Sequence, residues 1–591
     1  MQAHYSIATP DSHAKLPAMP TASLEMESSE LTVRRAWWRS LSLFWSPPQY
    51  QIVRFLIPCL LALVYAVAFW SWDVQADGLV GAHGLQPWEP WMERVRALGD
   101  EGKVTFWDMP TLFRWVHGDQ WLHWIPRAGM AVALLVCLGI LQGPLLLVLW
   151  FGYLSIIHIG SPFMSFQWDT LLLEAGLIIA FLAPWRFQRG WRVPKADKGI
   201  FPLGAVWLLQ WLFFRLMFQA GWVKLAWDDK PWLDCSALLY HYQTQPLPPW
   251  TAWYAHHLPA WWQQFSCWAT YVVEIGLPFG IFLGRWGRLT ACVGVVGLMI
   301  VIAVTGNYTF FNWLAIILAL TLLDDRLWPR WVRRLLGVNP QIMVQEEDDE
   351  EEGEDDEAPL VIRVERPRLQ WRRVVAIVWM SIGWLATGLA IFLSLLPWSM
   401  EWRNAPAAKG EANGAIPKVT RFIGDLAPEW SKKWYQTVAP FLSVNSYGLF
   451  RSMTTDRPEI IIEVSSDGLF WEEVPFKYKM GDLKKAPGFV APFQPRLDWQ
   501  MWFAALNLQR GVMDGWLPSL LNAILEGRTE VLELIGPLPL PKDKIRQVRV
   551  LLYDYTFTTA SERNETGQWW NRKLIHNFGN DGLLVKKPTN W

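Results

Sequence analysis

Polar side chains inside long apolar stretches are the residues best placed for chemistry in this sequence. Those side chains are His158, Asp169, Glu174, Arg215, Gln219, Lys224 and Glu274. Because a charge inside a membrane is costly, such residues usually form pairs or serve a function. They could line an intramembrane cavity that binds a polar lipid headgroup or a quinone-like molecule. They could equally form structural ion pairs, and His158 alone is more typical of a packed histidine than of a ligand.

Arg215 and Lys224 lie in one apolar stretch, nine residues apart, which places them on roughly opposite sides of a helix. We therefore expect different partners for the two cations, and Glu174 and Glu274 are the available carboxylates. Arg215 lies about 13 residues into the stretch, roughly 20 Å along a helix, which is too deep to reach water easily. Lys224 and Asp169 lie nearer to the ends of their stretches, where snorkelling to the interface is expected.

The composition is that of an integral membrane protein. Of 591 residues, 52% are hydrophobic and 18% are charged, compared with about 25% charged in soluble domains. The 43 tryptophans suit membrane interfaces. The 53 basic and 54 acidic residues nearly cancel, so no overall field attracts nucleic acid. The five cysteines show no metal-ligand spacing and no disulfide framework, and we expect no metal or cofactor.

Nine stretches approach the roughly 20 apolar residues that a membrane-spanning helix needs. They lie near 52–72, 126–142, 143–160, 168–185, 202–227, 266–283, 289–306, 309–324 and 374–397. Residues 126–160 form either two spans joined by a turn at Gln142-Gly143-Pro144 or one kinked helix. The Arg- and Lys-rich segments all fall on one side of nine spans, which predicts a cytoplasmic N-terminus and an outside C-terminus.

The predicted fold is a polytopic α-helical membrane protein with a C-terminal β-rich α+β extramembrane domain. Its expected parts are a cytoplasmic segment (1–51), eight spans (52–335) with outside loops at 73–125 and 228–264, an acidic cytoplasmic linker (336–373), span nine (374–397) and an outer domain (398–591). Strand-like patterns begin near residue 441. Two β-rich runs around Asp467-Gly468 predict a hairpin, 545–557 predicts a strand, and 497–508 and 517–526 predict helices.

Several motifs of the chain resemble the lipase maturation factor family. In the predicted spans and the second outside loop these are SFQWDTLLLE (165–174), RLMFQAGWVKL (215–225) and HYQTQPLP (241–248). In the outer domain they are QPRLDWQMWF (494–503), which contains Arg496, Asp498, Trp499 and Trp502, together with LYDY (552–555) and TGQWW (566–570). The resemblance implies a chaperone-like maturation factor whose partners are membrane lipids and a secreted lipase or another exported client. Animal members reside in the endoplasmic reticulum membrane, whereas the scarcity of outside cysteines favours a bacterial inner membrane.

A shorter resemblance supports an alternative. AGWVKL (220–225) is similar to the catalytic stretch of vitamin K-dependent γ-carboxylase, in which a lysine deprotonates the hydroquinone. That similarity implies a membrane enzyme of lipid or quinone chemistry with Lys224 as the base. Such a lysine must be desolvated enough to stay neutral. A lipid or quinone bound near Lys224 would favour the enzyme, and co-purification of a lipase through residues 441–575 would favour the maturation factor.

Overall fold

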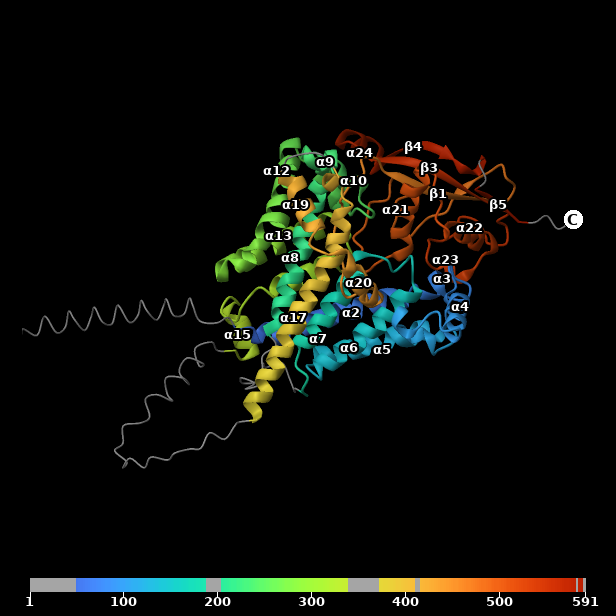
Figure 1. Cartoon of the computed structure of the whole chain (residues 1–591). Helices are drawn as coiled ribbons and strands as arrows, with labels where there is room; N and C mark the ends of the chain where they lie inside the picture. Colours follow the sequence, from blue (N-terminus) through green and yellow to red (C-terminus); the bar gives the residue numbers. More distant parts are fainter. Residues whose placement is uncertain (1–48, 188–202, 339–370, 410–414, 581–582, 588–591) are drawn as a thin grey trace, which may run out of the picture. The chain divides into compact units, whose positions relative to one another are not determined.

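The computed structural model describes residues 49–187, 203–338, 371–409, 415–580 and 583–587. All described residues from Tyr50 onward belong to one compact unit, which contains both the helical bundle and the C-terminal domain (Figure 1). The acidic tract at 346–357 and most of the predicted cytoplasmic N-terminal segment lie outside the described residues.

Six helices of the described residues are long and apolar enough to cross a membrane. They are α2 (Gln51–Asp73), α6 (Gln142–Ile159), α8 (Leu203–Ala226), α12 with its continuation (Ala260–Phe282), α13 (Gly284–Thr305) and the apolar part of α17 (Ser381–Arg403). Three other predicted spans form helices that are shorter or less apolar: α5 (Gln120–Cys137), α7 (Gln167–Leu182) and α14 (Phe311–Leu320). The chain is therefore a polytopic helical membrane protein, and the number nine remains a prediction.

Residues 126–160 form two helices, because α5 ends at Cys137 and α6 begins at Gln142. The connecting residues include Leu141 in a left-handed conformation, with φ of 41°. The predicted turn at Gln142–Pro144 is therefore wrong by about four residues. Those residues form the first turn of α6, where a proline is tolerated because the first N–H groups of a helix have no intrahelical partner.

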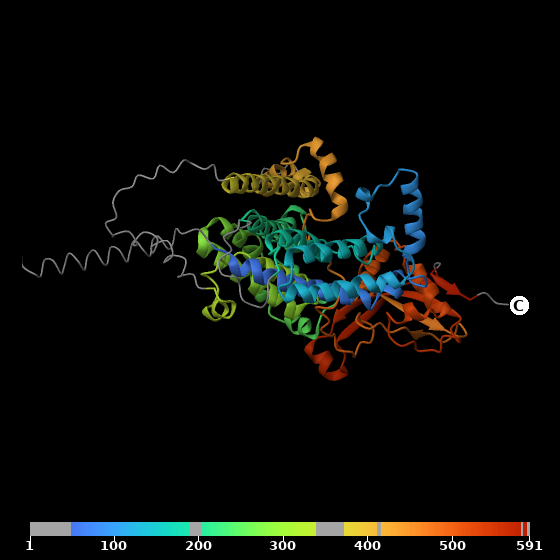
Figure 2. The ribbon, with the colours of Figure 1, turned by 90° about the horizontal axis from the view of Figure 1, so that it is seen from below.

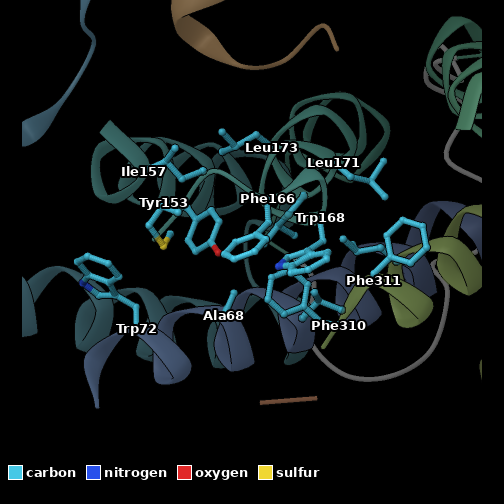
Figure 3. Packing of buried hydrophobic residues seen from close by; sticks show 14 of the residues in the cluster. Ala68, Trp72, Tyr153, Ile157, Phe166, Trp168, Leu171, Leu173, Phe310 and Phe311 are labelled. Carbon is cyan, nitrogen blue, oxygen red and sulfur yellow. The ribbon is translucent and has the colours of Figure 1, made fainter. Parts of the chain in front are cut away.

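Aromatic side chains fill the space between the bundle helices. Tyr153 of α6 packs edge-on against Tyr65 and Phe69 of α2, with ring centroids 5.9 and 5.4 Å away. Phe166 and Trp168, at the start of α7, stack at 4.7 Å. Figure 3 shows these rings packed with residues of α2 and with Phe310 and Phe311 at the start of α14. Close packing of this kind is what holds helices together in lipid.

Short helices occupy the two predicted outside loops and the segment after α17. The first loop contains α3 (Ala76–Val80), α4 (Trp88–Asp100), η1 (Phe106–Asp108) and η2 (Leu112–Arg114). The second contains α9 (Lys230–Leu233), α10 (Ala237–Thr244) and α11 (Trp250–His256). Helix α15 is Arg330–Leu336, and α17 as a whole is Trp371–Arg403. After α17 come α18 (Pro406–Lys409), α19 (Ala415–Gly424), η5 (Glu429–Ser431), α20 (Lys432–Val438) and η6 (Ala439–Phe441).

The C-terminal domain contains a small antiparallel sheet (Figure 1). Its strands are β1 (Pro458–Ser465), β2 (Glu472–Glu473), β3 (Gln547–Phe557), β4 (Trp570–Asn577) and β5 (Leu584–Lys586), in the order β2-β1-β3-β4, with β5 also paired to β3. The helices are α21 (Arg496–Gln509), α22 (Leu517–Glu526), α23 (Thr529–Leu532) and α24 (Ala560–Thr566). The predicted strand at 545–557 and both predicted helices are confirmed.

The predicted hairpin is confirmed, but its second strand has only two residues. Glu463 of β1 pairs with Glu473 of β2. The strand is short because the side chain of Asp467 accepts hydrogen bonds from the backbone N–H groups of Leu469 and Phe470, which extends the turn. The prediction that strand-like structure begins near 441 is wrong, since β1 begins at Pro458.

Candidate functional site

Glu174, Arg215 and Gln219 form a polar cluster where α7 and α8 pack together. Arg215 and Glu174 form an ion pair whose two side chains are no more than 3% exposed. Arg215 lies in the middle of α8, twelve residues after Leu203 and eleven before Ala226. The deep cation therefore has a carboxylate partner on the neighbouring helix.

Residues 442–448, which we call the inner loop, complete this cluster. Glu174 Oε2 accepts hydrogen bonds from the Tyr447 hydroxyl at 2.7 Å and from the Asn445 backbone and side-chain amides, both at 3.1 Å. Arg215 Nη1 donates to the Asn445 carbonyl at 2.9 Å, and the Tyr447 N–H donates to Gln219 Oε1 at 2.6 Å. The charged side chains thus satisfy the backbone of an irregular segment.

The contacts of the inner loop favour the alternative interpretation of these side chains as structural groups. The ligand cavity stays a prediction. Glu174, Arg215 and Gln219 all direct hydrogen-bonding atoms at residues of the chain itself. His158 lies nearby on α6, with Nε2 3.0 Å from the carbonyl oxygen of Pro440. It therefore packs against the segment that leads into the inner loop, as expected for a structural histidine.

Lys224 and Glu274 form a second, separate ion pair. Lys224 Nζ donates to Glu274 Oε2 at 2.7 Å and to the carbonyl of Ala220 at 2.8 Å, and the ammonium lies 5.0 Å from the centre of the Trp232 ring. Lys224 is 3% exposed. The expectation that it snorkels to the interface is wrong, because a carboxylate within the bundle replaces water as its partner.

A π-helical turn, η3 (Val272–Gly276), brings Glu274 to this position. Gly221 of α8 allows the close approach, since a Cβ at that residue would lie 2.8 Å from the Cβ of Glu274. Inserted π turns are frequent at functional sites, but they also change which helix face a residue occupies. The phase of an ideal helix therefore could not predict the partner of Lys224.

Asp169 binds Arg496 of the C-terminal domain. The guanidinium bonds both carboxylate oxygens, with Nη1–Oδ2 and Nη2–Oδ1 distances of 3.1 Å, and neither residue is exposed. The Tyr153 hydroxyl donates to Asp169 Oδ1 at 2.5 Å. The expectation that Asp169 snorkels is therefore wrong. Bidentate arginine–carboxylate pairs are among the stronger polar contacts in proteins, and this one joins the bundle to the outer domain.

Residues 494–503, the docking motif, make further contacts with the bundle around Asp169. Gln494 Oε1 accepts from Trp168 Nε1 at 2.7 Å, and the N–H of Arg496 donates to Gln75 Oε1 at 2.8 Å. Trp499 packs edge-on against Trp168, with centroids 4.8 Å apart. Trp502 Nε1 donates to the carbonyl of Thr244 at 2.9 Å, so the motif also reaches the second outside loop.

Arg457 forms a second connection between the outer domain and that loop. Its guanidinium donates to the carbonyls of Gln243 at 2.6 Å and Pro246 at 2.9 Å, and to Glu459 Oε1 at 2.8 Å. Arg457, Gln75, Asn445 and Tyr447 were not among the predicted site residues. Arg457 precedes the predicted hairpin, but Gln75, Asn445 and Tyr447 carry no sequence pattern that would have singled them out.

Asp498, by contrast, supports the fold of the outer domain itself. Its Oδ1 accepts from the backbone N–H groups of Tyr478 at 3.1 Å and Lys479 at 2.8 Å. Burial raises the pKa of Asp498 to about 6. The folded protein consequently binds this proton more tightly than the unfolded chain does, so the contribution of Asp498 to stability falls as the pH rises from about 4 to about 6.

We expect Asp498→Asn to stabilise the protein at neutral pH. The amide oxygen can accept the same two hydrogen bonds, while the buried negative charge is removed. The increase in the free energy of unfolding should approach about 3 kcal/mol above pH 6 and vanish near pH 4. Thermal unfolding in detergent between pH 4 and pH 8 measures it. Equal melting temperatures of the two proteins at pH 7.5 would contradict the expectation.

Comparisons with known proteins cover both parts of this arrangement. The lipase maturation factor transmembrane domain matches residues 52–330, and the lipase maturation factor C-terminal domain matches residues 443–580. The chain is 34% identical to lipase maturation factor 2 of Gallus gallus, over 88% of the chain and 79% of that protein. It is 33% identical to lipase maturation factor 2 of Homo sapiens (88% and 81%) and 30% identical to lipase maturation factor 1 of Mus musculus (89% and 86%). No solved structure matches the chain.

Proposed function

Because the chain belongs to the lipase maturation factor family, we propose that it is a membrane factor that assists the folding or assembly of exported lipases. The observation that carries the proposal is the similarity of both the bundle and the C-terminal domain to relatives that bear this name. Membrane lipids surround the bundle in this proposal, and a secreted lipase or another exported client binds the outer domain.

The contacts between the two parts support this proposal. Asp169–Arg496 and the carbonyl contacts of Arg457 hold the C-terminal domain against the ends of the bundle helices. A factor that receives clients as they leave the membrane benefits from a binding domain with a fixed position. The buried ion pairs then serve the architecture, and the client-binding surface lies on the C-terminal domain.

Co-expression with a secreted lipase tests the proposal. Cells that lack their own lipase maturation factor would express the lipase with or without this chain. We expect the ratio of secreted lipase activity to lipase antigen to rise severalfold with the chain, while a secreted protein that is not a lipase is unaffected. An unchanged ratio in the presence of correctly folded chain would reject the lipase as client. Co-purification of the lipase through residues 441–575 would identify the C-terminal domain as its binding region.

The proposed topology places the N-terminus in the cytoplasm and the C-terminal domain outside. The membrane would be a bacterial inner membrane or, in a eukaryotic host, that of the endoplasmic reticulum. Two natural Asn-X-Thr sequences can report on which side of the membrane the C-terminal domain lies. Asn564 is exposed on α24, whereas Asn307 is 3% exposed and donates to the carbonyls of Leu247 and Gly488, both at 2.9 Å.

In a glycosylating host we therefore expect one glycan, on Asn564. Asn307 lies two residues beyond the end of α13, close to the membrane and bonded within the fold. The measurement is the gel mobility before and after endoglycosidase treatment, with Asn564→Gln as the control that removes the shift. A fully folded protein without any glycan would place the C-terminal domain in the cytoplasm.

Variants of Lys224 distinguish the maturation-factor proposal from the enzyme alternative. Lys224 Nζ donates to Glu274 Oε2 and to the carbonyl of Ala220, so the lysine has an ion-pair partner within the bundle. We expect Lys224→Ala alone to reduce the amount of folded protein, because Glu274 would be left buried without a cation. The double variant Lys224→Met, Glu274→Gln removes both charges and should retain both folded protein and lipase maturation. A folded double variant with no activity would favour the enzyme.

A further inference from the structure

The segment between α17 and the C-terminal domain returns deep into the helical bundle. Trp430 stacks on Phe392 of α17, with ring centroids 6.3 Å apart. Phe392 lies eleven residues before Arg403, the end of that helix, or about 16 Å along its axis. A hydrocarbon core about 30 Å thick has its middle at about this depth.

The segment also contacts a second helix, α6, at a similar depth. The Phe441 ring stacks on Trp150 of α6 with centroids 6.3 Å apart, and Trp150 Nε1 donates to Ser443 Oγ at 3.1 Å. Trp150 lies nine residues before Ile159, the end of α6, which is about 14 Å along the axis. That end of α6 faces the C-terminal domain, since the carbonyl of Phe163 shortly after it bonds Arg496.

The inner loop then rises along α8 toward the C-terminal domain. Asn445 bonds Arg215, Tyr447 bonds Gln219, and Gly448 lies beside Val223. These three residues of α8 follow one another at intervals of about one helical turn. Because the segment starts at the end of α17 and leads back to the docked outer domain, it enters and leaves on one side. Figure 2 shows orange elements of this part of the chain beside one end of α17, in yellow.

The outward side of the segment carries two exposed tryptophans, beside which Lys433 is also exposed. Trp430 and Trp434 are 62% and 56% exposed, and on the neighbouring α17 Leu385 is 74% exposed. Trp430 contacts both Phe392 of α17 and Trp434, with ring centroids 6.3 and 6.4 Å apart, so these three rings form one apolar surface. Such a surface at the depth of the hydrocarbon core fits acyl chains.

We propose that residues 415–448 form a re-entrant element that reaches the middle of the bilayer. Its exposed Trp430 and Trp434 contact the acyl chains of the leaflet on the side of the C-terminal domain, and its inner loop is held by Glu174, Arg215 and Gln219. Irregular backbone is tolerated at membrane depth only where protein groups satisfy its N–H and C=O groups. This requirement is the physical reason for three polar side chains at the centre of the bundle.

Spin labels at three exposed positions test the proposal on the full chain in lipid vesicles. Trp434→Cys is the test site, Leu385→Cys on α17 is the lipid control, and Phe470→Cys at the hairpin turn, 79% exposed, is the aqueous control. The five native cysteines are buried and free, so labelling of folded protein is directed to the introduced thiol. The measurement is the collision rate of each label with oxygen and with a water-soluble nickel chelate.

The label at position 434 should show an oxygen-to-nickel ratio severalfold above that at position 470 and similar to that at position 385. A ratio equal to that at position 470 would place the segment in water and overturn the proposal. Low collision rates with both reagents, together with dipolar broadening between labels, would mean that a second copy covers the surface and would reject lipid contact. Trp430→Cys, on the same side of the element, replaces the test site if Trp434→Cys does not fold.

Discussion

Arg215→Ala is expected to remove most of the folded protein from the membrane. The substitution leaves Glu174 buried with only the neutral donors of Asn445 and Tyr447, and it leaves the carbonyl of Asn445 without its 2.9 Å donor. Breaking one side of a buried pair costs about 3–5 kcal/mol. That loss is a large share of the roughly 5–15 kcal/mol by which proteins are stable.

Fluorescence-detected size exclusion of detergent extracts measures the folded fraction for this variant. Arg334→Ala, at an exposed position of α15, is the matched control and should behave as wild type. The double variant Arg215→Met, Glu174→Gln removes both buried charges and should recover part of the folded fraction. Normal amounts of folded Arg215→Ala protein would show that water or another group replaces the guanidinium, and would contradict the role assigned to the inner loop.

Arg496→Ala should release the C-terminal domain from the bundle. Asp169 would keep only the Tyr153 hydroxyl as a hydrogen-bond donor among the contacts described, and the bidentate contact would be lost. We expect a loss of about 3–5 kcal/mol in docking free energy. Because the outer domain has its own sheet and helices, the loss should appear as undocking before it appears as unfolding.

Limited proteolysis measures this undocking, through the rate of cleavage at residues 449–457, between the inner loop and β1. Arg510→Ala, at the exposed end of the same helix α21, is the control and should leave that rate unchanged. Adding Asp169→Asn to Arg496→Ala removes the uncompensated charge and should slow cleavage again. If Arg496→Ala is cleaved at the wild-type rate, other contacts of the docking motif suffice and Asp169–Arg496 is not the main connection.

Several elements followed from local sequence patterns alone. Apolar length and low charge predict membrane helices such as α2 and α13, and two β-rich runs around Asp467-Gly468 predict the β1–β2 hairpin. Helices α21 and α22 were predicted nearly to the residue. These features depend on neighbours within a few turns of chain, which is why one sequence suffices to predict them.

The partners of the buried charges required the tertiary structure. The sequence indicated that Arg215 and Lys224 have different partners, because their spacing on one helix is a local property. It could not choose Glu174 for Arg215, and the π turn at Glu274 changes the helix phase that would identify the partner of Lys224. Asp169 and Arg496 are 327 positions apart, and no local pattern connects them.

The inner loop is the clearest case of a feature that only the folded chain defines. It has no helical or strand periodicity, so its sequence predicts neither a structure nor a position in the membrane. Its backbone is satisfied by side chains such as Arg215 and Gln219, which are more than 220 residues away. The sequence alone indicated that charged side chains lie within long apolar stretches. Which groups they bind depends on how distant helices pack, since an unsatisfied backbone in lipid is too costly to remain without partners.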